Sequence, residues 1–92
     1  MENNKKMTIW YVDAQISQMK DTLEFARTIE PKGEKRAREW TLRNLEDLFE
    51  RANGVLGFAQ IYIECLNDDE QNELYKKLFR AYSEYKDQAY AL

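Results

Sequence analysis

Apolar residues recur at alternating spacings of three and four in the first third of the chain. The positions that carry this spacing are Ile9, Val12, Ile16, Met19, Leu23 and Ala26. Such a heptad pattern is typical of a helix that packs along one side in a bundle or coiled coil. Thr8 can cap this helix with its hydroxyl, and Pro31 and Gly33 end it. We therefore predict a helix over residues 8–29 and a disordered polar tail over residues 1–7.

A second, longer heptad pattern follows. Its core positions are Thr41, Leu45, Leu48, Ala52, Val55, Ala59, Tyr62 and Leu66, with Leu42, Phe49, Leu56 and Ile63 in a flanking column. Both columns keep their phase through Gly54 and Gly57, which favours one continuous helix over residues 34–66. Each internal glycine costs a helix about 1 kcal/mol relative to alanine, and Asn53 followed by Gly54 is an acceptable helix end. A break at Gly54, which would give four helices, is therefore the alternative.

The third pattern starts after a cluster of polar residues. Asn67 with Glu70, or Asp68 with Gln71, has the spacing of a capping box, in which two side chains satisfy the first backbone amides of a helix. The seam that follows holds Tyr75, Leu78, Tyr82, Tyr85, Ala89 and Leu92, with Leu74, Phe79 and Ala81 beside it. We predict a third helix over residues 69–90.

These patterns predict an all-α chain that folds as an antiparallel three-helix bundle. Short connections between helices place sequential helices side by side in opposite directions. Strand-rich small domains need frequent Gly and Pro turns, and this sequence has only three glycines and one proline. We expect residues 8–92 to form a single helical domain.

Antiparallel pairing of the first two helices makes two local predictions. It brings Phe25 near Trp40, and it lays the indole of Trp10 over the glycines at 54–57. The predicted helices also differ in length, so that the first and third helices cover different parts of the second. The ends of the second helix would then have a neighbour on one side only.

Composition excludes several classes of chemistry. The chain has 92 residues, a formal net charge of −3, no histidine and one cysteine. Without histidine, the usual catalytic bases and zinc sites are missing, and one cysteine cannot form an internal disulfide. The acids Glu46, Asp47 and Glu50 fall on the predicted outer face and are interpreted as solvated surface. We expect no enzymatic activity, no metal and no cofactor.

The sequence also predicts a cytoplasmic protein with no membrane contact. The longest apolar stretch, residues 55–66, is interrupted by Gly57, Gln60 and Glu64, and is too short and too polar to span a bilayer. The apolar stretch near the N-terminus covers only residues 9–12, which is too short for a signal peptide.

Surplus apolar residues outside the heptad seams, together with the seam residue Tyr62, mark a candidate interface. They widen the apolar surface at the C-terminal end of the second helix and form a second column on the first helix. The candidate interface residues are Trp10, Tyr11, Phe25, Phe58, Ile61, Tyr62 and Cys65. An apolar surface of this kind commonly meets another chain. We interpret Cys65 as a buried or interfacial thiol rather than a nucleophile, because acidic residues surround it in the sequence.

A basic stretch forms the second candidate surface. Its members are Lys35, Arg36, Arg38, Trp40 and Arg43. Arg36, Trp40 and Arg43 share one helical face, where an indole between two guanidiniums can bind an acidic protein or stack on a base. The alternative is a solvated surface helix with Trp40 packed on Phe25. Residues 64–73 hold five acids and no base, so opposite charges gather towards the two ends of the second helix.

These features favour a non-enzymatic protein-protein interaction module. We expect a regulator or inhibitor that binds a protein partner of unknown identity and that forms a homodimer. A nucleic-acid-associated regulator that uses the basic residues 32–43 is one alternative. A second alternative is an immunity or anti-defence inhibitor of bacterial or phage origin that blocks a toxin or defence enzyme through the acidic end, residues 64–73. Size and composition resemble those of small bacterial or phage helical proteins that bind another protein.

Overall fold

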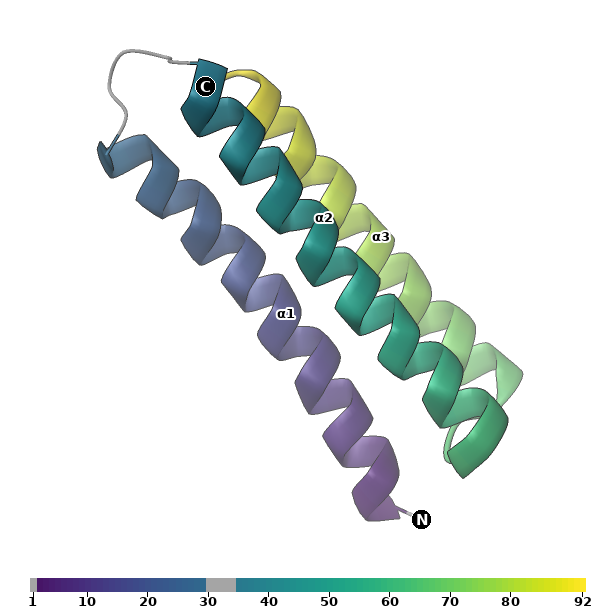
Figure 1. The fold of residues 1–92 in the computed structure, drawn as a ribbon. Helices are drawn as coiled ribbons and strands as arrows, with labels where there is room; N and C mark the ends of the chain where they lie inside the picture. The colour runs from purple at the N-terminus through teal and green to yellow at the C-terminus, as the bar shows by residue number, and fades with distance from the viewer. Residues whose placement is uncertain (1, 30–34) are drawn as a thin grey trace.

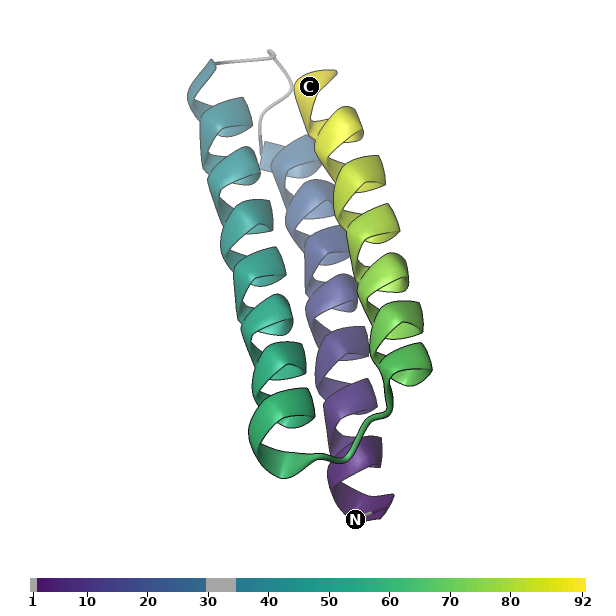
Figure 2. The same cartoon turned by 90° about the vertical axis from the view of Figure 1, so that its right-hand side faces the viewer.

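The computed structural model describes residues 2–29 and 35–92. The elements are α1 (Glu2–Ile29), α2 (Lys35–Phe58), the π-helical turn η1 (Ala59–Ile63) and α3 (Asp68–Tyr90). The three long helices lie side by side, and each runs antiparallel to the one before it (Figures 1 and 2). The molecule measures 48 × 18 × 15 Å. The predicted antiparallel three-helix bundle is confirmed, and the alternative break at Gly54 does not occur.

The hydrophobic core runs along the centre of the bundle and takes side chains from all three helices. Its buried residues are Val12, Met19, Leu23 and Ala26 from α1, Leu45, Leu48, Ala52, Leu56 and Ala59 from α2 and η1, and Leu66, Leu74, Leu78 and Ala89 from the rest of the chain. Most of these positions belong to the heptad columns, since the same side of each helix returns every three to four residues. Thr41 is also buried, and its hydroxyl donates to the carbonyl of Ala37 at 2.7 Å.

Helix α1 begins earlier than the sequence predicts. It starts at Glu2, so residues 2–7 are helical where we predicted a tail, and the predicted start at residue 8 is wrong. Thr8 is buried inside the helix, and its hydroxyl donates to the backbone carbonyl four residues earlier, at 2.8 Å, instead of capping the N-terminus. Lys5 forms an ion pair with Glu70 of α3, so these first turns have a neighbour to pack on. The predicted mismatch in length between the first two helices is therefore much smaller, since α1 has 28 residues and α2 has 24, followed by the five residues of η1.

Helix α2 passes through Gly54 and Gly57 without a break, as the phase of the heptads predicts. Helix α2 ends at Phe58, and the helical segment continues through η1 to Ile63, three residues before the predicted boundary at residue 66. Glu64 then follows in the left-handed conformation with φ of 55°. The amide of Glu64 donates to the carbonyl of Ala59. A π-helical turn holds more residues than an α-helical turn, so it rotates the later side chains out of phase. This rotation explains why Tyr62, a predicted core position, is 72% exposed.

The two local predictions for the α1–α2 pair have opposite outcomes. Phe25 and Trp40 are in contact, with ring centroids 6.0 Å apart, so that prediction is confirmed. The prediction that Trp10 covers the glycines is wrong. No side chain lies within 4 Å of where a Cβ on Gly54 or Gly57 would be, and Trp10 is 68% exposed. Trp10 lies two residues before the buried Val12, which turns it to the opposite side of α1.

Helix α3 begins with the predicted capping box. The side chain of Asn67 accepts a hydrogen bond from the amide of Glu70 at 2.8 Å, and the side chain of Glu70 accepts from the amide of Asn67 at 3.0 Å. Polar contacts tie α3 to α1 along the surface, where Lys77 pairs with Asp13 at 2.7 Å. No helix within residues 2–29 and 35–92 has the length and apolar character needed to span a membrane.

Candidate functional site

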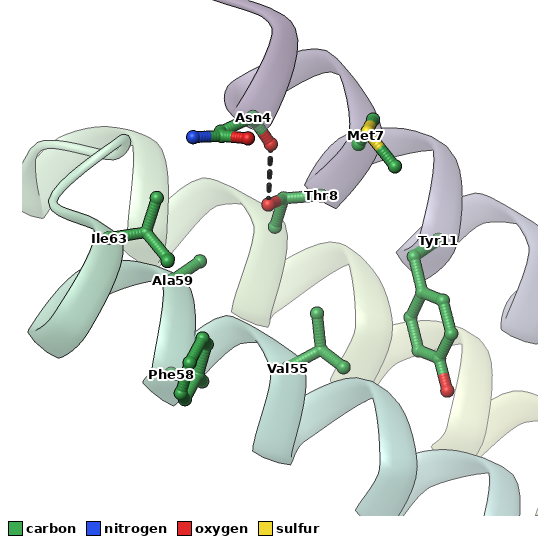
Figure 3. Close-up of a pocket in the computed structure, with 8 residues that line it drawn as sticks. All are labelled: Asn4, Met7, Thr8, Tyr11, Val55, Phe58, Ala59 and Ile63. Atoms are coloured by element: carbon green, nitrogen blue, oxygen red, sulfur yellow. Dashed lines mark hydrogen bonds between the residues drawn. The ribbon is translucent and has the colours of Figure 1, made fainter. Parts of the chain in front are cut away.

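An apolar groove lies where the first turns of α1 meet the end of α2 and η1 (Figure 3). It has a volume of about 220 Å³ and is open to the surface. Its lining residues are Asn4, Met7, Thr8 and Tyr11 from α1, and Val55, Phe58, Ala59 and Ile63 from α2 and η1. The Thr8 hydroxyl is already bonded to the Asn4 carbonyl. The groove therefore presents mainly apolar carbon atoms to whatever occupies it.

Three large apolar side chains stand on the α2 side of this groove and project into water. Phe58, Ile61 and Tyr62 are 54%, 66% and 72% exposed. The rings of Phe58 and Tyr62 pack on each other, with centroids 5.2 Å apart. Because η1 rotates Tyr62 away from the core, this surface is larger than a single heptad seam provides. Exposed apolar clusters of this size mark binding surfaces more often than single exposed residues do.

Cys65 lies behind the groove rather than in its lining. It is half-buried, and its Sγ is 3.8 Å from the Oγ1 of Thr8 and 3.9 Å from the carbonyl oxygen of Ala59. These are the weak polar contacts that a thiol makes when it packs as a small apolar side chain. The structure thus places Cys65 among the residues that hold η1 against α1.

The opposite end of the α1–α2 side carries the second candidate surface. Arg36, Glu39, Trp40 and Arg43 line a shallow hollow of about 180 Å³, which brings together three of the five predicted basic-patch residues. Arg38 lies apart from them, because its Nη2 donates to the backbone oxygen of Leu92 at 2.9 Å. The side chain of Lys35, the fifth predicted residue, lies outside the described residues.

The candidate interface residues do not form one surface. Tyr11 and Phe58 line the groove, Tyr62 packs on Phe58, and Ile61 is an exposed residue of η1. Phe25 sits at the other end of the same side, where it contacts Trp40. Trp10 lies exposed on the outward side of α1 and belongs to neither group. The α1–α2 side therefore holds one apolar cluster at each end.

Sequence reasoning missed an aromatic cluster on the α2–α3 side. Phe49 contacts Tyr75, Phe79 and Tyr82, with centroid distances of 6.4, 6.3 and 4.6 Å. The amine of Lys86 lies 5.4 Å from the centre of the Tyr82 ring. The sequence pattern that could have revealed this cluster is the column of aromatic residues at 75, 79 and 82 in the third helix. This column faces the flanking column of the second helix, to which Phe49 belongs. We name Phe49, Tyr75, Phe79 and Tyr82 the aromatic seam.

A third hollow lies on α3 and is lined mostly by charged residues. It has a volume of about 330 Å³ and is lined by Glu73, Leu74, Lys76, Lys77 and Arg80. Lys77 is already paired with Asp13. Within the described part of the chain, no three His, Cys, Asp or Glu side chains come close enough together to hold a metal ion.

The chain was compared with known proteins at three levels. No protein-family model matches it, and no match was found among curated proteins or solved structures. Its surfaces are therefore interpreted from their own geometry and chemistry.

Proposed function

We propose that this protein works by binding another protein chain, as a non-enzymatic helical interaction module. The observation that carries this proposal is the apolar groove between α1 and η1, with Phe58, Ile61 and Tyr62 more than half exposed beside it. Burying these side chains against a partner removes apolar surface from water, at roughly 25 cal/mol per Å². Aromatic side chains in particular are enriched at protein interfaces.

The shape of the groove favours a protein partner over a small molecule. It is open along its length and follows two antiparallel helices, which suits a helix or an extended segment lying lengthwise. A small-molecule pocket encloses most of its ligand and offers several converging polar groups. Here the polar lining is limited to Asn4, Thr8 and Tyr11.

We further propose that the protein is a regulator or inhibitor in the cytoplasm. A small helical bundle with exposed apolar clusters on its α1–α2 side can act by covering a surface of its partner. The cytoplasm is the compartment we favour, because the unpaired thiol of Cys65 is tolerated where thiols stay reduced.

Affinity capture with a matched pair of variants tests the proposal. The test variant carries Phe58→Glu and Ile61→Glu, and the control carries Trp10→Glu and Tyr90→Glu, which change two equally exposed side chains elsewhere. We expect the wild type and the control to retain the same protein, and the test variant to lose it. Equal capture by all three proteins, each with an unchanged helical circular dichroism spectrum, would contradict the proposal.

A second candidate is a nucleic-acid-associated regulator. The hollow in which Arg36 and Arg43 flank the ring of Trp40 favours it, since guanidiniums bind phosphates and an indole stacks on bases. The same hollow also includes Glu39, which repels phosphate. Titration with single-stranded DNA or RNA at two salt concentrations tests this candidate. Binding that weakens steeply with salt and is lost in Arg36→Glu with Arg43→Glu would support it.

A further inference from the structure

Helix α2 carries a second stripe of residues that none of the three helices covers. The stripe consists of Arg36, Trp40, Asp47, Arg51, Gly54 and Phe58, all of them exposed. They recur at spacings of three, four and seven, which keeps them on one face of the helix. This face borders α1, because Trp40 contacts Phe25 and Phe58 lines the groove with Met7. The stripe is thus the α2 half of the α1–α2 side.

The stripe is arranged so that it can pair with itself. Its two aromatic residues, Trp40 and Phe58, lie equally far from the level of Phe49. A two-fold axis at that level, perpendicular to α2, lays a second copy of the helix antiparallel on the first. Trp40 then meets Phe58 of the second copy, and Arg36 lies beside the Phe58–Tyr62 ring pair of the second copy. A cation beside an aromatic ring is a favourable contact, and a two-fold interface forms each contact twice.

Charge complementarity at the centre of the stripe points to the same register. Asp47 and Arg51 lie on either side of the axis, one turn apart. Neither forms an ion pair or a side-chain hydrogen bond with any described residue. In the antiparallel dimer, Asp47 of each copy faces Arg51 of the other. In a parallel dimer, Asp47 would face Asp47, and like charges across an interface cost affinity.

The same two-fold axis also places α1 against α1 of the second copy. Phe25 is level with Trp40, because their rings are in contact, and Met7 is level with Phe58, because both line the same groove. The rotation that places Trp40 on Phe58 of the second copy therefore places Met7 on Phe25 of the second copy. A methionine against an aromatic ring is a favourable packing contact. Each apolar cluster on the α1–α2 side is then covered by the other cluster of the second copy.

We infer that the α1–α2 side is the interface of an antiparallel homodimer, in which α2 pairs with α2 of a second copy about the level of Phe49. The inference rests on the proposed function and names its partner as this same chain. The stripe from Arg36 to Phe58 is about 33 Å long and two helices are about 20 Å wide, so each copy can bury roughly 650 Å². That area lies within the range of stable, specific protein interfaces, about 600–1,000 Å² per partner.

A charge swap across the interface tests the register. We expect the wild type to dimerise in sedimentation-velocity runs over a concentration series. Each single variant, Asp47→Arg or Arg51→Asp, places two pairs of like charges opposite each other across the two-fold interface. Each variant should therefore weaken dimerisation by about tenfold or more. The double variant Asp47→Arg with Arg51→Asp restores both pairs and should return the dissociation constant to near the wild-type value. Both residues are exposed, so helical circular dichroism should not change.

Two tryptophan variants provide a matched control. Trp40→Ala should weaken the dimer, whereas Trp10→Ala, on the outward side of α1, should leave it unchanged. A wild type that stays monomeric at high micromolar concentration overturns the inference, while the capture experiment still decides the proposed function separately. A dimer that both single charge variants leave intact, or that the double variant does not restore, overturns this interface. Binding of a different protein or of nucleic acid to the stripe of a monomeric chain also overturns it.

Discussion

Helix α2 has an aromatic surface on each side, and the two surfaces are built differently. On the α3 side, Phe49 contacts all three other members of the aromatic seam, one of them stacked at 4.6 Å. On the α1 side, aromatic residues occur as two separate pairs, Phe25 with Trp40 and Phe58 with Tyr62. Between the pairs the stripe is polar, with the charges of Asp47 and Arg51.

The difference shows why exposure alone does not identify a binding surface. Phe79 and Phe58 are exposed to similar extents. Phe79, however, contacts Phe49 and Tyr75, so it contributes to holding α2 and α3 together. Phe58 packs on Tyr62, which is itself exposed, and leaves the adjoining groove open. We therefore expect substitutions in the aromatic seam to affect folding, and substitutions on the α1–α2 side to affect association.

The largest expected effect is on the aromatic seam. Phe49→Ala removes the ring that all three other aromatic residues contact, and it should lower the free energy of unfolding by about 3 kcal/mol, the lower end for a phenylalanine lost from a core. Because Phe49 is only half-buried, we expect the loss of unfolding free energy at the lower end of that range. Urea unfolding followed by circular dichroism, at a protein concentration below the dimer dissociation constant, measures the change.

The matched control for Phe49→Ala is Tyr90→Ala, which removes an exposed aromatic ring of the same helix pair. It should change the free energy of unfolding by no more than about 0.5 kcal/mol. Equal destabilisation by both variants would mean that the seam contributes nothing specific, and the proposed division between the two sides of α2 would not hold.

The next largest effect is on association. Phe58→Ala removes an anchor that a two-fold dimer uses twice, and it should cost about 2 kcal/mol of dimerisation free energy, or roughly thirtyfold in the dissociation constant. The unfolding free energy of the monomer should change by less than about 1 kcal/mol, because Phe58 is 54% exposed. Sedimentation and urea unfolding on the same sample separate the two quantities. A loss of monomer stability as large as that of Phe49→Ala would contradict the comparison.

The heptad pattern predicted the architecture because the buried residues of a small bundle are set by local periodicity. Leu48 and Leu78 are buried where the pattern places them, and the spacing of Asn67 and Glu70 predicted a capping box that is present. Contact between Phe25 and Trp40 also followed, since antiparallel pairing fixes which levels of two helices face each other. These features depend on short sequence distances and on simple helix geometry.

Features that depend on tertiary contacts were not predictable in the same way. Helix α1 extends past Thr8 because its first turns have α3 and η1 beside them, which no local capping pattern reveals. The π-helical turn shifts Tyr62 out of the core, and no residue type in that segment predicts such a turn. The groove lies between the extended part of α1 and the end of α2 with η1, so its lining combines both of these unpredicted features. The grouping of the candidate residues into surfaces therefore could not be predicted from the sequence.

A smaller effect concerns the start of α3. Asn67→Ala removes an N-cap that accepts from the Glu70 amide, and should lower the free energy of unfolding by about 1 kcal/mol. Asn72→Ala is the control, because Asn72 is exposed within α3 and has no cap to lose. Since Asn67 lies outside the stripe on α2, dimerisation should stay unchanged in both variants. Weaker dimerisation in Asn67→Ala alone would show that the interface extends to the α2–α3 connection.

The smallest expected effect compares the two glycines of α2. Gly54→Ala and Gly57→Ala should each raise the free energy of unfolding of the monomer by about 0.5–1 kcal/mol, because alanine favours the helix and an added Cβ meets nothing within 4 Å. A larger side chain should affect dimerisation differently at the two positions. Gly54 belongs to the stripe and faces Asn44 of the second copy in the proposed dimer, so Gly54→Leu should weaken dimerisation. Gly57 lies off the stripe, so Gly57→Leu should not. Equal dissociation constants for the two leucine variants would mean that α2 does not approach a second copy through this face.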